Sequence, residues 1–238
     1  MSLTATYRLG TRLFWRDKSM LFASVITPVG LAVGLPTLMR HVTTGGVADA
    51  AAVAHASLSI LLAITAFMNI TVALTARRDQ LVLKRLRSTR LTDGQLLLGQ
   101  IASTATQTVA LIVVCTVAVR FAAGVPLPAN PLAFAAVTIA GSVVMSLLGA
   151  AYTAVVPRSE LAAAYTMPVF LVAAVAAGAM GPIPVPSWLR PVLDLLPTTV
   201  VVDAVRTGDL VVPFLTLAGW TVAGLVALRW FRWEPRRS

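Results

Sequence analysis

Six stretches of the chain, each roughly 20 residues long, contain no Asp, Glu, Lys or Arg. An α-helix of about 20 apolar residues crosses the ~30 Å hydrocarbon core of a bilayer. Only 12% of the residues are charged and 58% are hydrophobic, whereas soluble domains carry about twice that share of charge. We therefore predict a single all-α integral membrane domain over residues 1–238. Its spans are expected at about 20–39, 56–76, 96–119, 132–156, 161–180 and 211–228.

The basic residues are distributed unequally between the connecting segments. One side of the membrane receives 15 of the 19 Lys and Arg, in segments 1–19, 77–95, 157–160 and 229–238. The other side receives only Arg40, Arg120, Arg190 and Arg206. Because Lys and Arg resist translocation, the basic side is predicted to be cytoplasmic, with both termini there. The net charge of +10 lies on that side, where it meets anionic lipid and does not imply nucleic acid.

Two basic segments are expected to be helical outside the spans. Arg8, Arg12 and Arg16 repeat every four residues, which favours a helix over 1–19 lying in the cytoplasmic interface. The alternative is a basic flank that only sets topology. Residues 77–91 contain no Gly or Pro, and Leu and Val recur among the bases, so we expect a short helix that could dock on a cytoplasmic partner. Thr92 and Gln95 then form a predicted capping box.

The outer segment 181–210 has a different composition. Five prolines alternate with Trp and Leu, so the segment is too apolar for a solvated loop and too broken for a span. We expect short helices that enter the outer leaflet, forming a re-entrant segment. Non-helical backbone is stable within the hydrocarbon region only when it is buried in protein or lines a cavity.

Polar stripes follow two of the expected spans. The stripe on span four, which includes Ser142 and Ser146, is best explained by close helix–helix packing. The stripe on span three contains two large amides and is a better candidate for a substrate or water path. The candidate path residues are Asn69, Gln100, Thr104 and Gln107.

Several chemistries are not supported by the sequence. No Gly-x-x-x-x-Gly-Lys occurs, so this chain is not expected to hydrolyse ATP or to be an enzyme. The two histidines, His41 and His55, fall in a predicted outer loop at 40–55, and Cys115 is the single cysteine; we expect no catalytic, cofactor or metal site. No Asp, Glu, Lys or Arg lies deep inside a span, which argues against proton coupling but leaves open Na⁺ sites made of backbone carbonyls. A transporter of this kind must take its energy from a partner.

Two motifs resemble the permease subunits of bacterial type-2 ABC transporters, the drug and antibiotic exporter family. The first is Lys-Arg-Leu-Arg-Ser-Thr-Arg-Leu at 84–91, followed by Leu-Leu-Leu-Gly-Gln at 96–100. The second is Pro-Ser-Trp-Leu at 186–189, then Leu-Pro at 196–197 and Asp-Ala-Val-Arg at 203–206. There are departures. Arg78-Asp79-Gln80-Leu81 stands where the family often has Glu-Arg-x-x-Gly, and Arg90 replaces the usual Pro.

The resemblance implies a dimer of permeases, either a homodimer or a related heterodimer, in the bacterial plasma membrane. A separate ATPase subunit, which would hold ATP and Mg²⁺, is expected to drive export of a lipophilic or amphipathic substrate such as a drug, antibiotic or lipid. The expected ATPase-coupling residues are Lys84, Arg85, Leu86 and Arg87, with Asp79 in place of the family's Glu. The residues of the outer motif are Pro186, Trp188, Pro197, Asp203 and Arg206.

Two other functions stay open. One is an ion-driven secondary transporter or channel. The lack of intramembrane carboxylates weighs against it, and it leaves the basic segment 77–91 unexplained. The other is a membrane scaffold or immunity subunit that transports nothing, which the sequence does not exclude. A neighbouring gene for an ATPase would favour the exporter.

Overall fold

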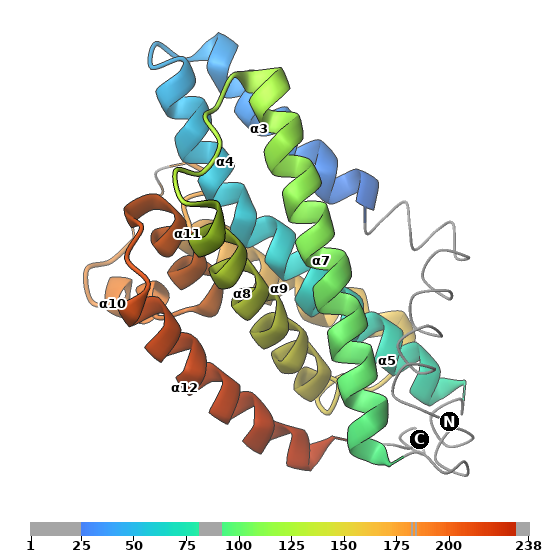
Figure 1. Cartoon of the computed structure of the whole chain (residues 1–238). Helices are drawn as coiled ribbons and strands as arrows, with labels where there is room; N and C mark the ends of the chain where they lie inside the picture. Colours follow the sequence, from blue (N-terminus) through green and yellow to red (C-terminus); the bar gives the residue numbers. More distant parts are fainter. Residues whose placement is uncertain (1–24, 81–91, 182, 184, 232–238) are drawn as a thin grey trace.

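The computed structural model (Figure 1) describes residues 25–80, 92–181, 183 and 185–231. Over these residues the chain is all-helical. The coupling residues Lys84, Arg85, Leu86 and Arg87 and the segment 1–19 lie outside the described residues.

A long central helix is formed by three segments that follow one another without a break. They are α4 (Val47–Leu61), the π-helical η2 (Leu62–Met68) and α5 (Asn69–Asp79). The remaining long helices are α3 (Thr27–Val42), α7 (Asp93–Ala123), α8 (Pro131–Tyr152), α9 (Ala162–Ala176) and α12 (Val211–Ala227). Short elements complete the chain: η3 (Ser159–Leu161), α10 (Arg190–Asp194), α11 (Pro197–Thr207) and η4 (Leu228–Trp230).

Five helices are long and apolar enough to cross a membrane: Val47–Asp79, Asp93–Ala123, Pro131–Tyr152, Ser159–Ala176 and Val211–Trp230. They correspond to five of the six predicted spans. The first predicted span begins outside the described residues, and its described part, α3, has 16 residues.

The outer loop predicted at 40–55 is wrong in its extent. Only residues 43–46 separate α3 from α4, and His55 lies inside α4. Residues 48–54 are mostly Ala, the strongest helix former, which extends the helix beyond the apolar run. Gly46, with φ of +55°, allows the tight reversal between the two helices.

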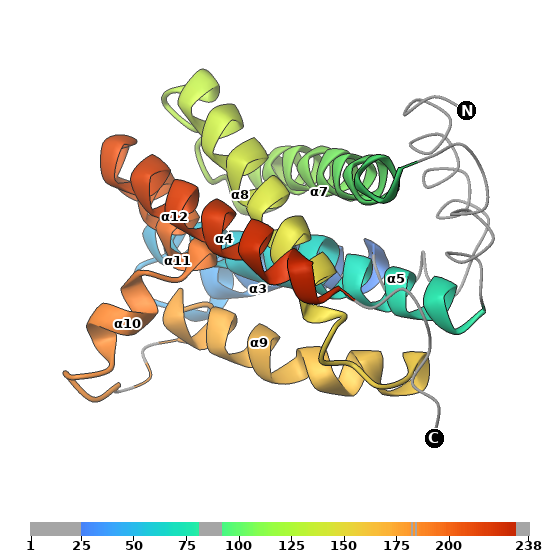
Figure 2. The same cartoon turned by 90° about the horizontal axis from the view of Figure 1, so that it is seen from below.

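The helices form a bundle around the central helix (Figures 1 and 2). In Figure 1 the α3–α4 and α7–α8 connections lie at the upper end, while α5, the start of α7 and the end of α12 lie at the lower end. The largest buried cluster joins the central helix to α7, α8 and α11, and it includes Leu62, Phe67, Ile112, Met145 and Val201. The short helix α11 is therefore part of the core.

The capping box predicted before α7 is confirmed. The Thr92 hydroxyl accepts from the Gln95 backbone N–H, and the Gln95 side chain accepts from the Thr92 N–H. This pairing satisfies two backbone donors at the start of the longest α-helix.

The polar stripe of α8 is buried, and at Gly149 it packs closely against the central helix, which supports the packing interpretation. Ser142 and Ser146 are fully buried, and the Thr71 hydroxyl donates to the Gly149 carbonyl oxygen at 2.9 Å. A Cβ on Gly149 would lie 2.5 Å from the Phe67 carbonyl oxygen. The two backbones approach so closely that only glycine fits at position 149.

We predict that Gly149→Ala destabilises the fold, because the new methyl group has no space against a backbone atom. Overpacking of this kind costs about 1–3 kcal/mol. Thermal unfolding of the purified protein in detergent should show a lower midpoint. Gly219→Ala is the matched control, since Gly219 lies in the membrane helix α12 and no atom is within 4 Å of its added Cβ. Equal midpoints for both variants would contradict the close contact.

Candidate functional site

The end of the central helix leads directly into the segment that the sequence marks for coupling. α5 ends at Asp79 and α7 begins at Asp93. The described part of the predicted coupling set is Asp79, which is the last residue of α5.

Arg78 is the largest fully buried side chain in the described structure, with 1% of its surface exposed. Its guanidinium donates to three backbone carbonyls: Thr153 O at 3.1 Å, Val156 O at 2.9 Å and Pro157 O at 3.0 Å. It also donates through Nε to Asp79 Oδ1 at 3.3 Å. The planar fork of donors that Arg carries is well suited to several oxygens at once.

These carbonyls explain why an arginine is tolerated in the interior. α8 ends at Tyr152, and the three carbonyls belong to its C-cap residue Thr153 and to two residues of the connection beyond it, where regular helical hydrogen bonding has ended. The C-terminal end of a helix dipole also favours a cation. Arg78 supplies both the donors and the charge, so its own desolvation is compensated by groups that would otherwise be unsatisfied.

Asp79 binds the other end of the same connection. Its Oδ2 accepts from the Ser159 backbone N–H at 2.6 Å. Ser159 begins the turn η3, which continues into α9 as one helix over Ser159–Ala176. A carboxylate at the first N–H groups of a helix is favoured by the helix dipole.

Arg77 contacts a third helix. Its guanidinium donates to the Oε1 of Gln100 on α7. Gln100 is buried, and its amide lies 3.5 Å from the Thr104 hydroxyl. Gln100 and Thr104 thus belong to a polar contact between the central helix and α7.

The other two candidate path residues lie on the same pair of helices. Gln107 is half-buried and donates to Ser103 Oγ at 3.2 Å, and Asn69 is half-buried at the start of α5. Nearby, Thr65 donates to Thr108 at 3.2 Å across the two helices. None of the four candidate path residues lines either of the two cavities described below.

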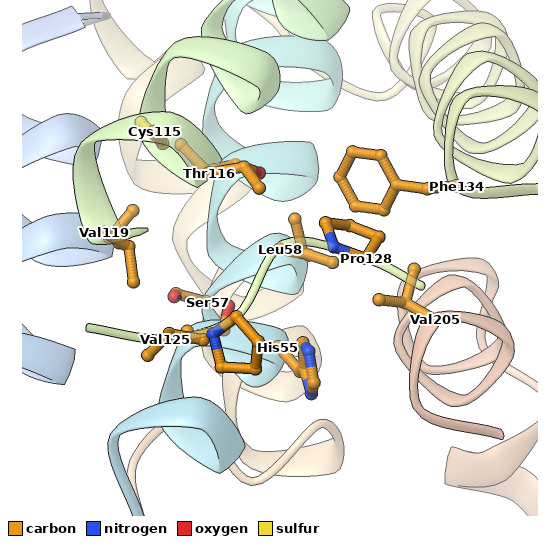
Figure 3. A pocket seen from close by; sticks show the side chains of 14 residues that line it. His55, Ser57, Leu58, Cys115, Thr116, Val119, Val125, Pro128, Phe134 and Val205 are labelled. Carbon is orange, nitrogen blue, oxygen red and sulfur yellow. Dashed lines mark hydrogen bonds between the residues drawn. The ribbon is translucent and has the colours of Figure 1, made fainter. Parts of the chain in front are cut away.

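A small pocket lies toward the end that holds the α3–α4 connection. His55, Ser57, Cys115, Thr116 and Phe134 are among the residues around it (Figure 3). Its volume is about 40 Å³, whereas ligand pockets usually measure about 300–1,000 Å³. This pocket is too small for a substrate.

A second cavity is large and apolar. Its volume is about 540 Å³, and it lies between Phe67 of η2 and the helices α8, α9, α11 and α12. The lining residues are Phe67, Met145, Leu148, Ala151, Tyr152, Val155, Pro168, Val169, Val172, Ala173, Leu196, Pro197, Thr198, Trp220 and Ala227. This size and lining suit a lipophilic molecule.

The residues of the outer motif are placed around α10 and α11. Pro197 is buried at the first position of α11, where its fixed φ suits a helix start. Arg206 donates to the Ala52 carbonyl at 3.2 Å and thus joins α11 to α4. Burial raises the pKa of Asp203, although the neighbouring Arg206 opposes the shift. Pro186 and Trp188 are exposed, so the motif does not form one compact cluster.

The structural role of Arg77 and Arg78 is not evident from the sequence, where both count simply as positive charges flanking a span. Their partners lie 23 to 79 residues further along the chain. One feature of the sequence could have indicated this role. Two arginines and Asp79 end an apolar run, and Asp79 stands where the family pattern has Glu.

A search of curated proteins finds no match to this chain. A family model described as "ABC-2 type transporter" matches residues 2–210. Because this match covers most of the sequence, the chain belongs to the ABC-2 type transporter family.

Proposed function

We propose that this chain is the membrane-spanning permease subunit of an ATP-driven exporter, energised by a separate ABC ATPase subunit. The observation that carries the proposal is the family match over residues 2–210, together with the five helices suited to cross a membrane. The sequence has no phosphate-binding loop, so ATP and Mg²⁺ would be held by the partner.

The ATPase is proposed to bind the basic segment 77–91 in the cytoplasm. Two features support this position. The segment combines Lys and Arg with recurring Leu, as a docking surface requires. Its first three residues, Arg77, Arg78 and Asp79, tie the end of the central helix to neighbouring helices, so the residues after Asp79 are the ones proposed to contact the ATPase. These hydrogen bonds would transmit a displacement of the segment to the neighbouring helices.

A second copy of the permease is also proposed. Six helices are few to enclose a transport pathway, which favours a homodimer or a related heterodimer. Large apolar side chains are exposed along α3, α7 and α12, including Leu38, Val114 and Leu225. In a membrane these surfaces would meet lipid or the second copy.

The proposed substrate is lipophilic or amphipathic, such as a drug, an antibiotic or a lipid. The apolar lining of the 540 Å³ cavity supports this class over a polar sugar chain. The cavity lies among helices suited to cross the membrane, where an apolar molecule would reach it from the hydrocarbon region.

We predict that Leu86→Asp prevents the ATPase from co-purifying with the permease and abolishes transport. A buried, unpaired carboxylate at the centre of the interface costs roughly 3–5 kcal/mol. The permease should still insert, because position 86 lies outside every predicted span. Leu86→Met preserves the apolar contact and should behave like the unmodified protein. Normal ATPase binding and transport in Leu86→Asp would show that the segment only sets topology.

We predict that the 43–46 turn faces the outside of the cell and that Ser88 faces the cytoplasm. The basis is the excess of Lys and Arg on the Ser88 side. In intact cells, a membrane-impermeant maleimide should label Thr44→Cys and should not label Ser88→Cys. The native Cys115 is buried and gives little background. Labelling of Ser88→Cys from outside would reverse the orientation.

We predict that filling the large cavity weakens binding of lipophilic molecules. Val172 lines the cavity, so Val172→Trp should reduce saturable labelling of the purified protein by a photoreactive fatty acid. Leu171→Trp is the matched control, because the neighbouring Leu171 has nearly the same exposure, 44% against 46%, and is not part of the lining. Similar labelling of both variants would argue against the cavity as a binding site.

A further inference from the structure

We propose that Arg77, Arg78 and Asp79 form a three-way junction that makes the end of the central helix move together with α7, α8 and α9. A displacement of the 81–91 segment would act directly on α5 and α7, the helices on either side of it. The junction would transmit the same displacement to α8 and α9. This inference deepens the proposed function and rests on it. The three residues are positioning residues, since they act through the helices that they join.

The first step is the direction of the three side chains. Successive residues of an α-helix point about 100° apart, so three in a row face three different sides. Arg77 contacts Gln100 on α7, Arg78 contacts the end of α8, and Asp79 contacts the start of the α9 helix. One turn of α5 is thereby connected to three other helices.

The second step is the match of charge to helix ends. Arg78, a cation, donates to carbonyls at and just beyond the C-terminus of α8. Asp79, an anion, accepts from an N–H at the N-terminus of the next helix. Both charges have the sign that the helix dipole favours at their position. The Arg78-Asp79 pair therefore binds both ends of the α8–α9 connection at once.

The third step concerns rigidity. Arg78 is buried, and separating it from α8 would leave a charge and three carbonyl oxygens without partners in the interior. Uncompensated burial of this kind is strongly unfavourable. The contact should persist while the helices move, so that α5 and the α8–α9 connection behave as one body.

The fourth step links the junction to the large cavity. The helices α8 and α9, which the junction holds, both line the cavity, through residues such as Leu148 and Val172. Trp220 and Ala227 of α12 contribute to the lining as well. In the described residues, Arg77, Arg78 and Asp79 form no hydrogen bond to α12. α12 packs on α8, where a Cβ on Gly224 would lie 2.8 Å from Leu147, whereas α9 lies across the cavity from both of them. A displacement of the junction would act on the start of α9 through Asp79, and would therefore shift α9 relative to α12 and change the cavity between them.

The test measures this shift in the complex of permease and ATPase in lipid. Spin labels at Leu171→Cys on α9 and Leu225→Cys on α12, in a Cys115→Ser background, report the distance between the helices. Both label sites are exposed. Trapping the ATPase with ATP and vanadate should shift the distance distribution. Arg78→Lys should lose most of this shift, because a single ammonium cannot replace the guanidinium fork, while the ATPase stays bound and hydrolyses ATP.

Arg158→Lys is the matched control. Arg158 is exposed on the same α8–α9 connection, so this variant should keep the full shift. Asp79→Ala is the second test variant, and it should also lose the shift. It decides the question if Arg78→Lys is not recovered as folded protein, because Asp79 is less buried than Arg78.

The outcomes separate this inference from the proposed function. If the unmodified permease does not bind an ATPase, the proposed function fails. If the ATPase binds and drives the shift, and both Arg78→Lys and Asp79→Ala retain it in full, the junction is overturned. Loss of the shift with bound, active ATPase in either variant supports the junction.

Discussion

The buried guanidinium of Arg78 is the interaction on which the basic end of this bundle depends. Charges are expensive away from water, and backbone carbonyl groups in a buried turn need hydrogen-bond donors. Placing one against the other removes both costs. Arg78 meets the carbonyls that follow α8, and Asp79 beside it meets the N–H group that begins the next helix. Without this pair, the turn at 153–158 would leave polar backbone groups unsatisfied in the protein interior.

Close backbone contact provides the second constraint. Away from the helix ends there is little driving force from the hydrophobic effect in a membrane, so association depends on packing and on hydrogen bonds between helices. Gly149 and Thr71 supply both, since the missing side chain at 149 allows the approach and the Thr71 hydroxyl bonds the Gly149 carbonyl. Gly141 makes a similar approach to Val201, which brings α11 into the core.

Hydrogen bonds at the basic end and an apolar cavity between helices define the arrangement of the bundle. The central helix, α7, α8 and α9 are connected at the basic end by hydrogen bonds of three consecutive residues. α12 lies across an apolar cavity from α9. In the proposed ATP-driven permease, this arrangement would place the proposed lipophilic site beside the helices that the proposed coupling segment would move. Coupling between two sites requires an element whose state both of them influence.

Much of the fold was predictable from the sequence. Charge-free stretches located five spans that the structure supports, and Thr92 with Gln95 located the start of α7, because hydrophobic length and local capping are properties of neighbouring residues. The motifs at 84–91 and 186–206 pointed to the family, which the match over 2–210 shows. Element ends were less accurate, as at α4, where Ala propensity extended the helix by nine residues past the predicted boundary at 56.

What the tertiary structure decided was the environment of individual side chains. The sequence shows that Gln100 is a polar residue within a span, but it does not show that Arg77 donates a hydrogen bond to it. Likewise, the sequence shows that Arg78 is charged, but it does not show that the side chain binds three carbonyls 75 to 79 residues away. The same holds for the cavity, which is bounded by segments from Phe67 to Ala227. Hydrophobic length and local capping are properties of neighbouring residues and can be read from the sequence, whereas burial and pairing are relations between distant segments that exist only once the helices have packed.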